Sequence, residues 1–560
     1  MTISLIPPGL LLVAGAAVLP LTAGWFRSLL VLALPLATLG LVWVAPDGVP
    51  GAMPFLDYTL TPVRGDALGR LFATIFTIMA FAGGLFALNQ RRVVELSAAF
   101  AYAGSAVGVS LAGDLITVFV FWEIMAVAST VVVWSAGTDA SYRASMRYML
   151  IHLLGGVILM IGIIAYIAET GSTAFDAMTA DRFATWMILA GFLLNAGAPP
   201  LSAWLPDAYP EASWSGMVTL SAFTTKTAVY VLLRGFPGAE ILVFVGLYMI
   251  FYGIIYALLE NDMRRILAYS IVNQVGFMVT GIGIGTEMAL NGAAAHAFSH
   301  IIYKGLLLMS AGAVLYQTGK RKCTDLGGLF RSMPVTTLCG IVGALSISSF
   351  PWTSGFISKS MVNQAAGDEG MAVAWFLLTA ASAGVFLHAG IKFPWFVFFQ
   401  KDSGLRPPDP PWNMRLAMIL LAVLSIGLGV WPDPLYRLLP YPVSYVPYTA
   451  PHVVNSLQLL LFAGLAFFVL LPQMKRSLTI SLDVDWFYRR AAPWIIARLA
   501  AVTVPIDARF RSAMRARLDA FIAGIFRTHG PQGILARTWP TGSTVLWVAI
   551  LLGAYLFLYY

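Results

Sequence analysis

The chain has 560 residues, of which 59% are hydrophobic and only 11% charged, and its net charge is +8. Soluble domains carry roughly 25% charged residues. The mean hydropathy of +0.81 and recurring apolar runs of about 17–25 residues therefore indicate an all-α polytopic membrane protein. A β-barrel is excluded because its short alternating segments are missing. The basic residues lie in short loops and one C-terminal segment, which argues against nucleic-acid binding.

Sixteen apolar stretches are long enough, or nearly so, to cross a membrane. We predict six regions: N-terminal helices in 1–94, a five-helix repeat in 95–234, a second in 241–399, additional helices in 400–472, a cationic surface segment in 473–541 and a last helix in 542–560. The sixteen spans cover residues 4–20, 29–45, 70–89, 95–111, 114–135, 148–168, 184–204, 215–234, 241–258, 266–284, 290–315, 335–360, 371–399, 414–432, 452–472 and 542–560.

The first apolar segment lacks a charged n-region and a cleavage site, so we predict a membrane helix and not a removable signal. Connections after odd-numbered spans are rich in Lys and Arg, for example Arg91, Arg264 and Lys320, whereas those after even-numbered spans hold few. The positive-inside rule then predicts that both termini lie outside the cytoplasm, which is the periplasmic side in a bacterial inner membrane, the location that we expect.

Two spans are interrupted in a similar way. The seventh carries Asn-Ala-Gly-Ala-Pro-Pro-Leu-Ser over 195–202, and the twelfth carries Ser-Phe-Pro-Trp-Thr-Ser-Gly over 349–355. Unpaired backbone groups at membrane depth are tolerated where the segment lines a polar cavity or is packed in protein. Interrupted helices in corresponding positions of two halves indicate inverted repeats with a site at their midplane. We therefore predict two inverted five-helix repeats, each with a broken helix.

The C-terminal stretch between Asp485 and Arg537 is rich in arginine, and apolar residues recur in it every three or four positions. This pattern predicts a cationic amphipathic helix that lies along a membrane surface. Pro493, Pro505 and Pro531 predict that the stretch is broken into pieces, the best patterned of which lies between the last two prolines.

A few titratable residues stand inside the apolar spans. Glu123 interrupts the apolar stretch 113–128, although a carboxylate at mid-membrane costs about 2.5 kcal/mol or more. Lysines recur in later spans, and two histidines share a helix face with one of them. Such a series can form a proton path, and its candidate members are Glu123, Lys226, His296, His300, Lys304 and Lys359.

Each of these residues also has a structural interpretation, as an ion-pair partner, a snorkelling cation or a packed polar group. His388 and Lys392, one turn apart, are either further stations of the path or an imidazole and a cation at a helix end. Histidine suits a relay because it titrates near neutrality and has two ring nitrogens. We also expect Glu123 to face a lysine, so that the two can alternate between an ion pair and two neutral groups.

The two cysteines, Cys323 and Cys339, are too few and too far apart for an iron–sulfur cluster, a zinc site or a haem attachment. The sequence has no Walker or GxGxxG motif in a usable context. We predict a chain without cofactor, metal or nucleotide, in which enzyme activity could come only from partner subunits.

Together the charged motifs resemble the antiporter-like membrane subunits of respiratory complex I and of Mrp-type cation/proton antiporters. The resemblance covers about residues 60–400, and the ordered set is far more specific than any one motif. The segments that carry it are Phe121–Glu123, Trp204–Ala212, Lys226–Tyr230, Asp262–Ser270, His296–Gly305 with its histidines and lysine four residues apart, and Gly355–Lys359.

The resemblance implies a fourteen-helix core in which a chain of buried charges carries protons. Glu123 would stand beside the first broken helix, and Lys226 would be a central lysine. The α-helical trio His296, His300 and Lys304 would continue the chain. Lys359 would end it. The C-terminal extension resembles those of the most distal complex I subunit and of the Mrp A-type subunit, but its prolines predict no long lateral strut.

The chain departs from the family pattern in three places. Asn195 stands where the family usually has Lys, Ser202 where His is common, and Arg264 where Lys is common. Asn can order water but cannot bind and release a proton in the relevant range. The full activity of the first half of the path is therefore in question.

Three functions follow from this resemblance. The first is the proton-translocating, D-type or related, subunit of an Mrp-type sodium (monovalent cation)/proton antiporter that works with other membrane subunits. The second is an antiporter-like subunit of a proton-pumping NADH:quinone oxidoreductase. The third is a structural homologue that has lost transport.

Overall fold

The structure is a computed structural model that describes residues 6–49, 51–472 and 483–560. The chain divides into two compact units, Met1–Asp485 and Trp486–Tyr560. Residues 473–482, the beginning of the expected surface segment, lie outside the described residues, as do the first two residues of the span expected over 4–20.

The first unit is a bundle of α-helices with one small β-hairpin, β1 (Met53–Phe55) and β2 (Tyr58–Leu60), in which Phe55 pairs with Tyr58. Its α-helices are α1 (Gly9–Val18), α2 (Gly24–Val44), α3 (Ala67–Phe86), α4 (Val93–Leu111), α5 (Leu115–Trp134), α6 (Asp139–Thr170), α7 (Phe183–Ala196), α8 (Trp204–Ala208), α9 (Gly216–Leu220), α10 (Thr224–Gly235), α11 (Ile241–Leu259), α12 (Met263–Ile284), α13 (Glu287–Thr318), α14 (Pro334–Ile347), α15 (Ser354–Asp368), α16 (Ala372–Val385), α17 (Trp412–Val430), α18 (Asp433–Tyr436) and α19 (Ala450–Leu470). Single 3₁₀ turns are η2 (Leu19–Leu21), η3 (Ala87–Asn89), η4 (Tyr209–Glu211), η5 (Cys323–Asp325) and η6 (Leu329–Arg331), and π-helical turns are η7 (Phe386–Lys392) and η8 (Trp395–Phe399).

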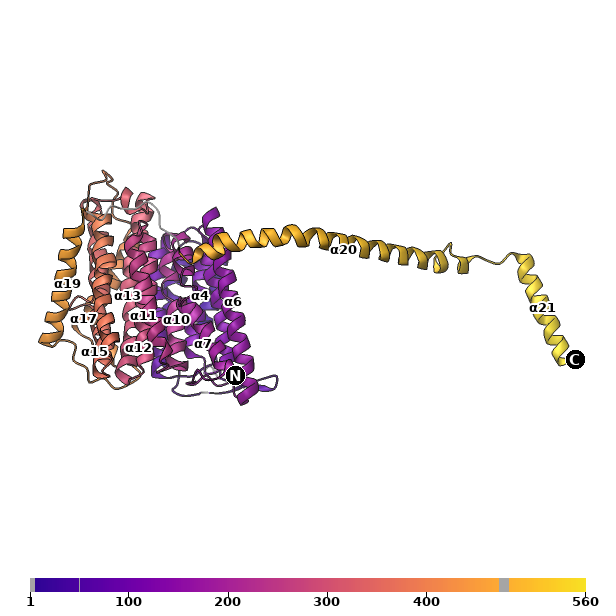
Figure 1. The fold of residues 1–560 in the computed structure, drawn as a ribbon, viewed down its shortest axis with the longest axis horizontal. Helices are drawn as coiled ribbons and strands as arrows, with labels where there is room; N and C mark the ends of the chain where they lie inside the picture. Colours follow the sequence, from indigo (N-terminus) through magenta and orange to yellow (C-terminus); the bar gives the residue numbers. More distant parts are fainter. Residues whose placement is uncertain (1–5, 50, 473–482) are drawn as a thin grey trace. The chain divides into compact units, whose positions relative to one another are not determined.

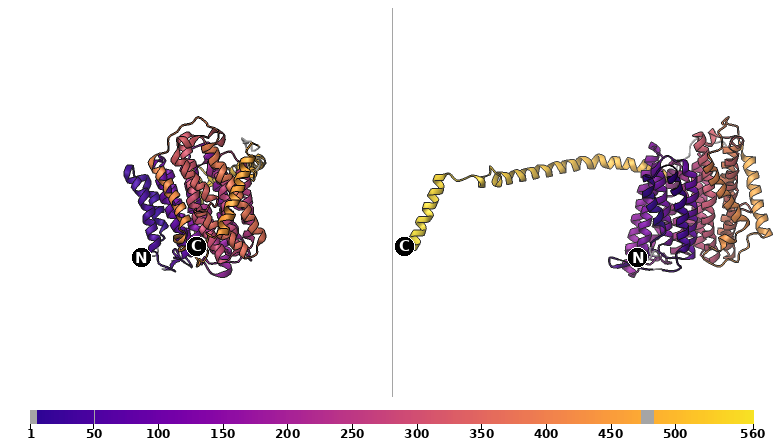
Figure 2. Two further views of the ribbon diagram at one scale, coloured as in Figure 1. Left: turned by 90° about the vertical axis from the view of Figure 1, so that its left-hand side faces the viewer. Right: turned by 180° about the vertical axis from the view of Figure 1, so that it is seen from behind.

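The long helices of this unit stand side by side, with α6 towards one edge and α19 at the other (Figures 1 and 2). Consecutive helices pack against each other, most extensively α11 with α12, α6 with α7 and α4 with α5. A glycine pair explains the first of these contacts, because a Cβ at Gly276 would lie 2.6 Å from the carbonyl oxygen of Gly246. The apolar windows of Gly216–Gly235, α12 and α13 are 94%, 100% and 94% buried. These helices therefore form the centre of the bundle.

The architecture is all-α and polytopic, as the sequence predicts. In the described part of the chain fourteen helices are long and apolar enough to cross a membrane, and the long C-terminal stretch Phe487–Ala536 is one of them. The first, seventh and twelfth predicted spans fall instead on the shorter apolar helices Gly9–Leu21, Phe183–Ala196 and Pro334–Ile347. Length and composition therefore do not confirm the expected count of sixteen.

Both predicted helix breaks are present. The seventh span stops at Ala196, where Gly197 adopts a left-handed φ of +81°, and resumes as α8. The twelfth span stops at Ile347 and resumes as α15, after left-handed backbone at Ser349 and Trp352. Helix ends leave carbonyl groups without intrahelical partners, so each break supplies acceptors inside the bundle.

The eighth span is also broken, which was not expected from the sequence. Helix α9 ends at Leu220 and α10 begins at Thr224. No proline marks this break; the segment is rich in Ser and Thr, whose side chains compete for backbone groups, and the Ser221 hydroxyl donates to the Val218 carbonyl oxygen at 2.8 Å. The thirteenth span holds the π-helical turns η7 and η8, a distortion that is frequent at functional sites.

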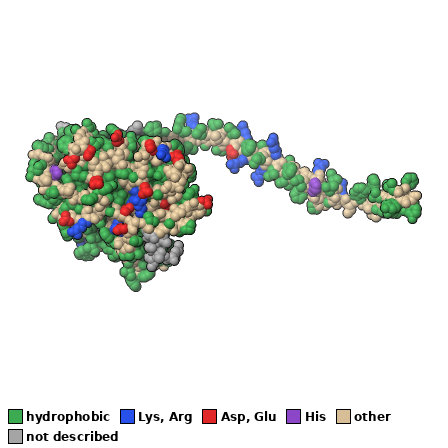
Figure 3. All heavy atoms as spheres, turned by 90° about the horizontal axis from the view of Figure 1, so that it is seen from below, with side chains coloured by type: hydrophobic (Ala, Val, Ile, Leu, Met, Phe, Trp, Pro, Cys, Tyr) green, Lys and Arg blue, Asp and Glu red, His purple; other side chains and the backbone are tan. Residues whose placement is uncertain are grey.

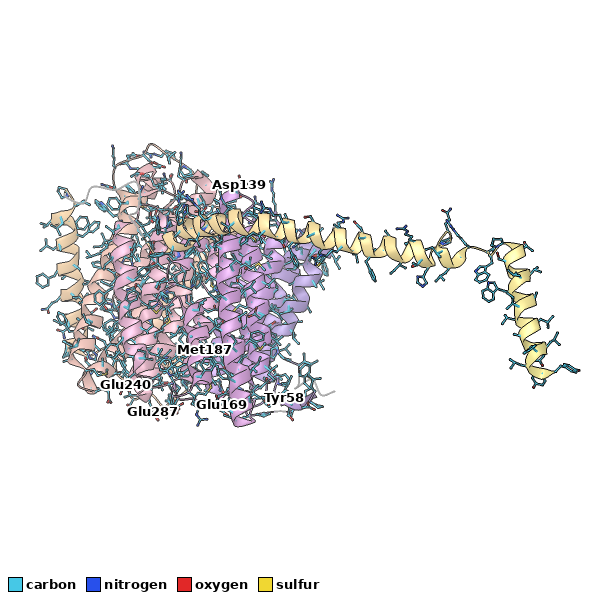
Figure 4. All side chains as sticks on the ribbon, turned by 45° about the vertical axis from the view of Figure 1, so that its right-hand side comes forward. Tyr58, Asp139, Glu169, Met187, Glu240 and Glu287 are labelled. Carbon is cyan, nitrogen blue, oxygen red and sulfur yellow. The ribbon has the colours of Figure 1, made fainter. Side chains whose placement is uncertain are left out.

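The loops sort onto the two ends of the bundle as the alternation of charge predicts. Figure 4 shows Asp139, which follows the fifth span, at one end, and Tyr58, Glu169, Glu240 and Glu287, which follow even-numbered spans, at the other. Figure 3 looks onto this second end, where acidic side chains are spread among hydrophobic ones.

Ion pairs join loops within each end. At the first end Arg147 pairs with Asp207 at 2.7 Å, and Arg321 pairs with both Asp262 at 2.8 Å and Glu211 at 3.2 Å. At the second end Arg64 pairs with Asp176 at 2.7 Å and Arg234 with Asp66 at 2.6 Å. These pairs hold the loops of each end together, and none of them crosses the bundle.

Two carboxylates in the loops of the first end differ in environment. Burial raises the pKa of Asp262, although the neighbouring Arg321 guanidinium opposes this change. Hydrogen bonds from Arg406 hold the pKa of the exposed Asp402 below its usual range. The first carboxylate also caps α12, because it accepts the backbone N–H of Arg264 at 2.9 Å.

The second unit contains η9 (Phe487–Ala491), α20 (Ala492–His529), η10 (Ile534–Ala536) and α21 (Thr541–Tyr559). The predicted interruption at Pro505 is wrong, because α20 runs through it. Pro493 follows the π-helical turn η9 with no interruption of the helical backbone, so the break predicted there is absent too, and Pro531 follows the end of the helix. An interior proline costs about 3 kcal/mol, but α20 is exposed along its length, so the carbonyl left unpaired has room for another partner.

The expectation of a short extension is therefore corrected as well. Helix α20 has 38 residues, which is about 57 Å at 1.5 Å per residue. Its arginines alternate with exposed apolar residues such as Phe510, Met514 and Leu518, which is the amphipathic pattern that the sequence indicates.

Candidate functional site

Glu123 lies on α5, with its side chain against the backbone of α6. A Cβ added at Gly156 would lie 2.0 Å from Glu123 Oε1, so this glycine makes the room for the carboxylate. Oε1 is buried, and within the described residues it has no hydrogen-bond partner and the carboxylate forms no ion pair. The expectation that a lysine faces Glu123 is therefore wrong: the apolar packing of α5 on α6 fills that position.

Lys226 is fully buried near the start of α10, directly after the unpredicted break. Its Nζ donates to the carbonyl oxygen of Ser221 at 2.7 Å and to Thr225 Oγ1 at 3.0 Å. Ser221 caps the C-terminal end of α9, where a cation is stabilised by the helix dipole and by unpaired carbonyls. The break therefore provides the oxygen acceptors that hold the ammonium group of this lysine.

The trio His296, His300 and Lys304 is fully buried on α13. The two imidazole centroids are 6.2 Å apart. His296 Nε2 lies 3.2 Å from Gln274 Oε1, whereas both nitrogens of His300 and the Nζ of Lys304 have no partner among the described residues. The structure thus places three titratable groups on one face at the centre of the bundle.

Lys359 lies on α15, immediately after the second predicted break. Its Nζ donates to the carbonyl oxygen of Ile347 at 2.7 Å, at the end of α14, and lies 4.9 Å from the ring centre of Phe277. The neighbouring Ser358 Oγ lies 2.9 Å from His296 Nδ1. This contact joins the α13 trio to the broken helix that carries Lys359.

A cavity of about 380 Å³, lined by both polar and apolar side chains, reaches Lys359. It lies between α15, α16 and α19, and its polar lining includes Asn363, Ser382, His452 and Asn455. On the opposite side the neighbouring Ser358 contacts His296 of the buried α13. Lys359 thus lies between the buried α13 trio and this cavity.

His388 and Lys392 lie in the π-helical turn η7. Lys392 Nζ donates to the carbonyl oxygens of Ala257, Leu258 and Glu260, at 3.1, 2.6 and 2.6 Å, at the C-terminal end of α11. His388 Nδ1 lies 2.8 Å from the carbonyl oxygen of Gly384. Of the two interpretations of Lys392, this geometry favours the cation at a helix end.

The three departures from the family pattern have different surroundings. Asn195 and Ser202, on either side of the first break, are buried, and within the described chain Asn195 Oδ1 and Ser202 Oγ have no partner. Arg264 donates to the carbonyl oxygens of Pro210, Ala212 and Ser213 at 2.7–2.9 Å. It therefore fixes the loop after α8.

Electrostatically the site has one cluster and one outlying group. Lys226, Lys304 and Lys359 all lie within electrostatic reach of His300. Glu123 lies outside this cluster. The predicted site does not include His152 on α6, which lies at the gap between Glu123 and the lysine cluster. A histidine in an apolar span, four residues before Gly156, is nevertheless visible in the sequence.

Comparison with known proteins decides the family. The transmembrane family described as NADH:quinone oxidoreductase/Mrp antiporter matches residues 112–386. The N-type subunit of the NADH-quinone oxidoreductase of Desulforudis audaxviator is 30% identical over 352 residues, which are 58% of this chain and 70% of that protein. This chain belongs to the NADH:quinone oxidoreductase/Mrp antiporter family.

Other members of the family are similarly close. The D-type subunit of the Na⁺/H⁺ antiporter of Alkalihalophilus pseudofirmus is 29% identical over 400 residues, which are 66% of this chain and 80% of that protein. A chain of the Mrp complex from Dietzia sp. DQ12-45-1b has the same fold, with a TM-score of 0.73 at 22% identity; the match covers 99% of this chain and 63% of that one.

Proposed function

We propose that this chain is the proton-translocating subunit of a multi-subunit Mrp-type monovalent cation/proton antiporter. The observation that carries the proposal is the buried cluster of lysines and histidines on α10, α13 and α15. Burying unpaired charged groups is expensive, and intramembrane titratable groups mark ion pathways. The similarity to the D-type subunit of an Na⁺/H⁺ antiporter over 80% of that protein gives independent support.

The cluster suits proton transfer because its members repel one another when charged. Lys226, Lys304 and Lys359 lie within electrostatic range of His300, and neighbouring like charges disfavour simultaneous protonation. A proton that arrives at one lysine therefore favours release from the next. We assign the order Glu123, Lys226, the α13 trio and Lys359, with the cavity beside Lys359 as its connection to the aqueous phase.

The proposal extends to the surroundings of the chain. We place it in a bacterial inner membrane, with both termini on the periplasmic side, in a complex with the other antiporter subunits. We also propose that 95–234 and 241–399 are two inverted repeats; the breaks between α7 and α8 and between α14 and α15 lie one in each range.

A second candidate is the antiporter-like subunit of a proton-pumping NADH:quinone oxidoreductase, favoured by the relative from Desulforudis audaxviator. The protein composition of the purified complex distinguishes the two. Small membrane subunits alone support the antiporter, whereas flavin and iron–sulfur subunits support the oxidoreductase.

Transport itself is tested with the purified complex in proteoliposomes that contain a pH-sensitive dye. We expect Glu123→Gln and Lys226→Ala each to reduce cation-driven proton flux by about ten-fold or more, while the complex still assembles. Unchanged flux in both variants would support the third interpretation, a homologue without transport activity.

A further inference from the structure

His152 is a buried imidazole at the gap between Glu123 and the lysine cluster. Its side chain is 1% exposed, and among the described residues neither ring nitrogen has a hydrogen-bond partner. The ring packs edge-on against Tyr148 and Trp204, with centroids 4.0 and 4.6 Å apart. Trp204 opens α8 on the far side of the first break, and its Nε1 donates to the Leu194 carbonyl oxygen at 3.0 Å.

On one side His152 is related to Glu123 through α6. His152 and Gly156 are four residues apart, and residues at this spacing lie on the same helix face about 5–6 Å apart. Gly156 is the residue against which Glu123 Oε1 packs. The imidazole and the carboxylate therefore share one face of α6, one turn apart.

On the other side His152 packs on the ring of Tyr148, whose hydroxyl group faces the break before Lys226. The Tyr148 hydroxyl donates to Ser129 Oγ at 2.9 Å and lies 3.4 Å from Thr224 Oγ1. Thr224 Oγ1 lies 2.5 Å from the Tyr102 hydroxyl. Thr224 is the first residue of α10 and stands two residues before Lys226.

Neither of the two polar side chains that flank the first break can hold a proton near neutral pH, and the buried Asp207 carboxylate of α8 is paired with Arg147 at 2.7 Å. The Asn195 amide and the Ser202 hydroxyl do not bind and release a proton near neutral pH. Imidazole does, and it can accept a proton at one nitrogen while it releases one from the other. His152 is thus the group at this break with both the chemistry and the position for the task.

We propose that His152 is a proton carrier that connects Glu123 with Lys226. One ring nitrogen takes up the proton that Glu123 releases, and the other nitrogen gives its proton to the hydroxyl groups of Tyr148 and Thr224, which pass it towards Lys226. This inference rests on the proposed transport function, and it adds a residue on α6 to the pathway.

The test is the variant His152→Gln in the whole complex, purified and reconstituted for proton flux. Gln is polar and cannot titrate, and since the imidazole nitrogens have no partner among the described residues, the change removes no hydrogen bond to them. We expect flux to fall about ten-fold or more, with unchanged assembly and melting temperature. The matched control is His529→Gln, which removes an exposed imidazole at the end of α20 and should keep full flux.

A compensating variant separates a proton carrier from a structural residue. Leu194 packs on Gly155, so the adjacent Asn195 lies about one turn from His152 along the contact between α7 and α6. We expect Asn195→Lys to restore part of the flux in the His152→Gln background, because it returns a titratable group to the gap. Loss of flux that Asn195→Lys does not relieve would overturn the inference.

Two further outcomes are distinguishable. Full flux in His152→Gln, together with loss in Glu123→Gln, would overturn the role of His152 and leave the proposed function intact. Full flux in both variants would overturn the proposed function, and the role of His152 with it.

Discussion

At the scale of single residues, three buried lysines of the bundle are held in the same way. Lys226, Lys359 and Lys392 each donate to carbonyl oxygens at the end of a helix segment. Such carbonyls lack intrahelical partners and carry the negative end of the helix dipole. Helix ends inside the bundle therefore make it possible to bury an ammonium group without a carboxylate beside it. Lys304 differs, because within the described residues its Nζ has no such acceptor.

The number of carbonyl partners distinguishes Lys392 from the other buried lysines. Lys392 has three such partners, so we expect Lys392→Met to destabilise the complex by about 1–3 kcal/mol, the cost of leaving buried acceptors unpaired. Lys392→Arg keeps a cation at the same helix end but cannot release a proton. The expected result is a lower melting temperature for the Met variant and near-normal flux for the Arg variant. Loss of flux in a well-folded Arg variant would instead make Lys392 a station of the path.

At the scale of elements, the contact of α5 with α6 sets the position of Glu123. Two adjacent glycines on α6 receive side chains from different helices: Gly155 contacts Leu194 of α7, and Gly156 contacts Glu123 of α5. The absence of a Cβ at Gly156 is what allows the carboxylate to approach the helix backbone. The orientation of Glu123 thus depends on a residue with no side chain.

This dependence predicts a transport defect in Gly156→Ala. The new Cβ would overlap Glu123 Oε1, and a displacement of about 1 Å at a reacting group can cost about 100-fold in rate. We expect proton flux to fall by about ten-fold or more, with at most about 1–3 kcal/mol of destabilisation from overpacking. Gly427→Ala is the matched control, because no atom lies within 4 Å of a Cβ at that position on α17. Wild-type flux in Gly156→Ala would show that the position of the carboxylate is not limiting.

At the scale of the whole molecule, the alternation of loop charge and the sorting of loops onto two ends agree. Asp139 lies at one end of the bundle, and Glu169 lies at the other (Figure 4). The end with Asp139 also carries the ion pairs of Arg147 and Arg321. Positively charged loops stay in the cytoplasm during insertion, so this end is the one that we assign to the cytoplasm.

Cysteine labelling of intact cells tests this orientation. Ala140 and Ala177 are exposed, and they lie in connections that follow the fifth and sixth spans. We expect Ala177→Cys to react with a membrane-impermeant maleimide in intact cells and Ala140→Cys to react only after permeabilisation. The native Cys323 and Cys339 are buried and give little background. The reverse pattern of labelling would place both termini in the cytoplasm.

Sequence alone determined the helical architecture, the alternation of the loops and the two breaks marked by Pro and Gly, because these follow from hydropathy and backbone chemistry that act locally. It also located the lysines and histidines of the candidate path, since a charge within an apolar span is conspicuous wherever it folds. The local rule that an interior proline interrupts a helix failed at Pro505. Helix α20 continues through this residue because one lost hydrogen bond is a small part of a 38-residue helix.

Tertiary structure decided the rest, because side-chain partners depend on which helices meet. It broke the eighth span at a Ser- and Thr-rich segment and placed Lys226 on the end of α9. It set Glu123 against a glycine instead of a lysine, and it turned Lys392 towards the carbonyls of α11. It also brought His152 of α6 into the gap beside the first break. None of these contacts has a local signature, because each joins residues from different helices that only the packing of the bundle brings together.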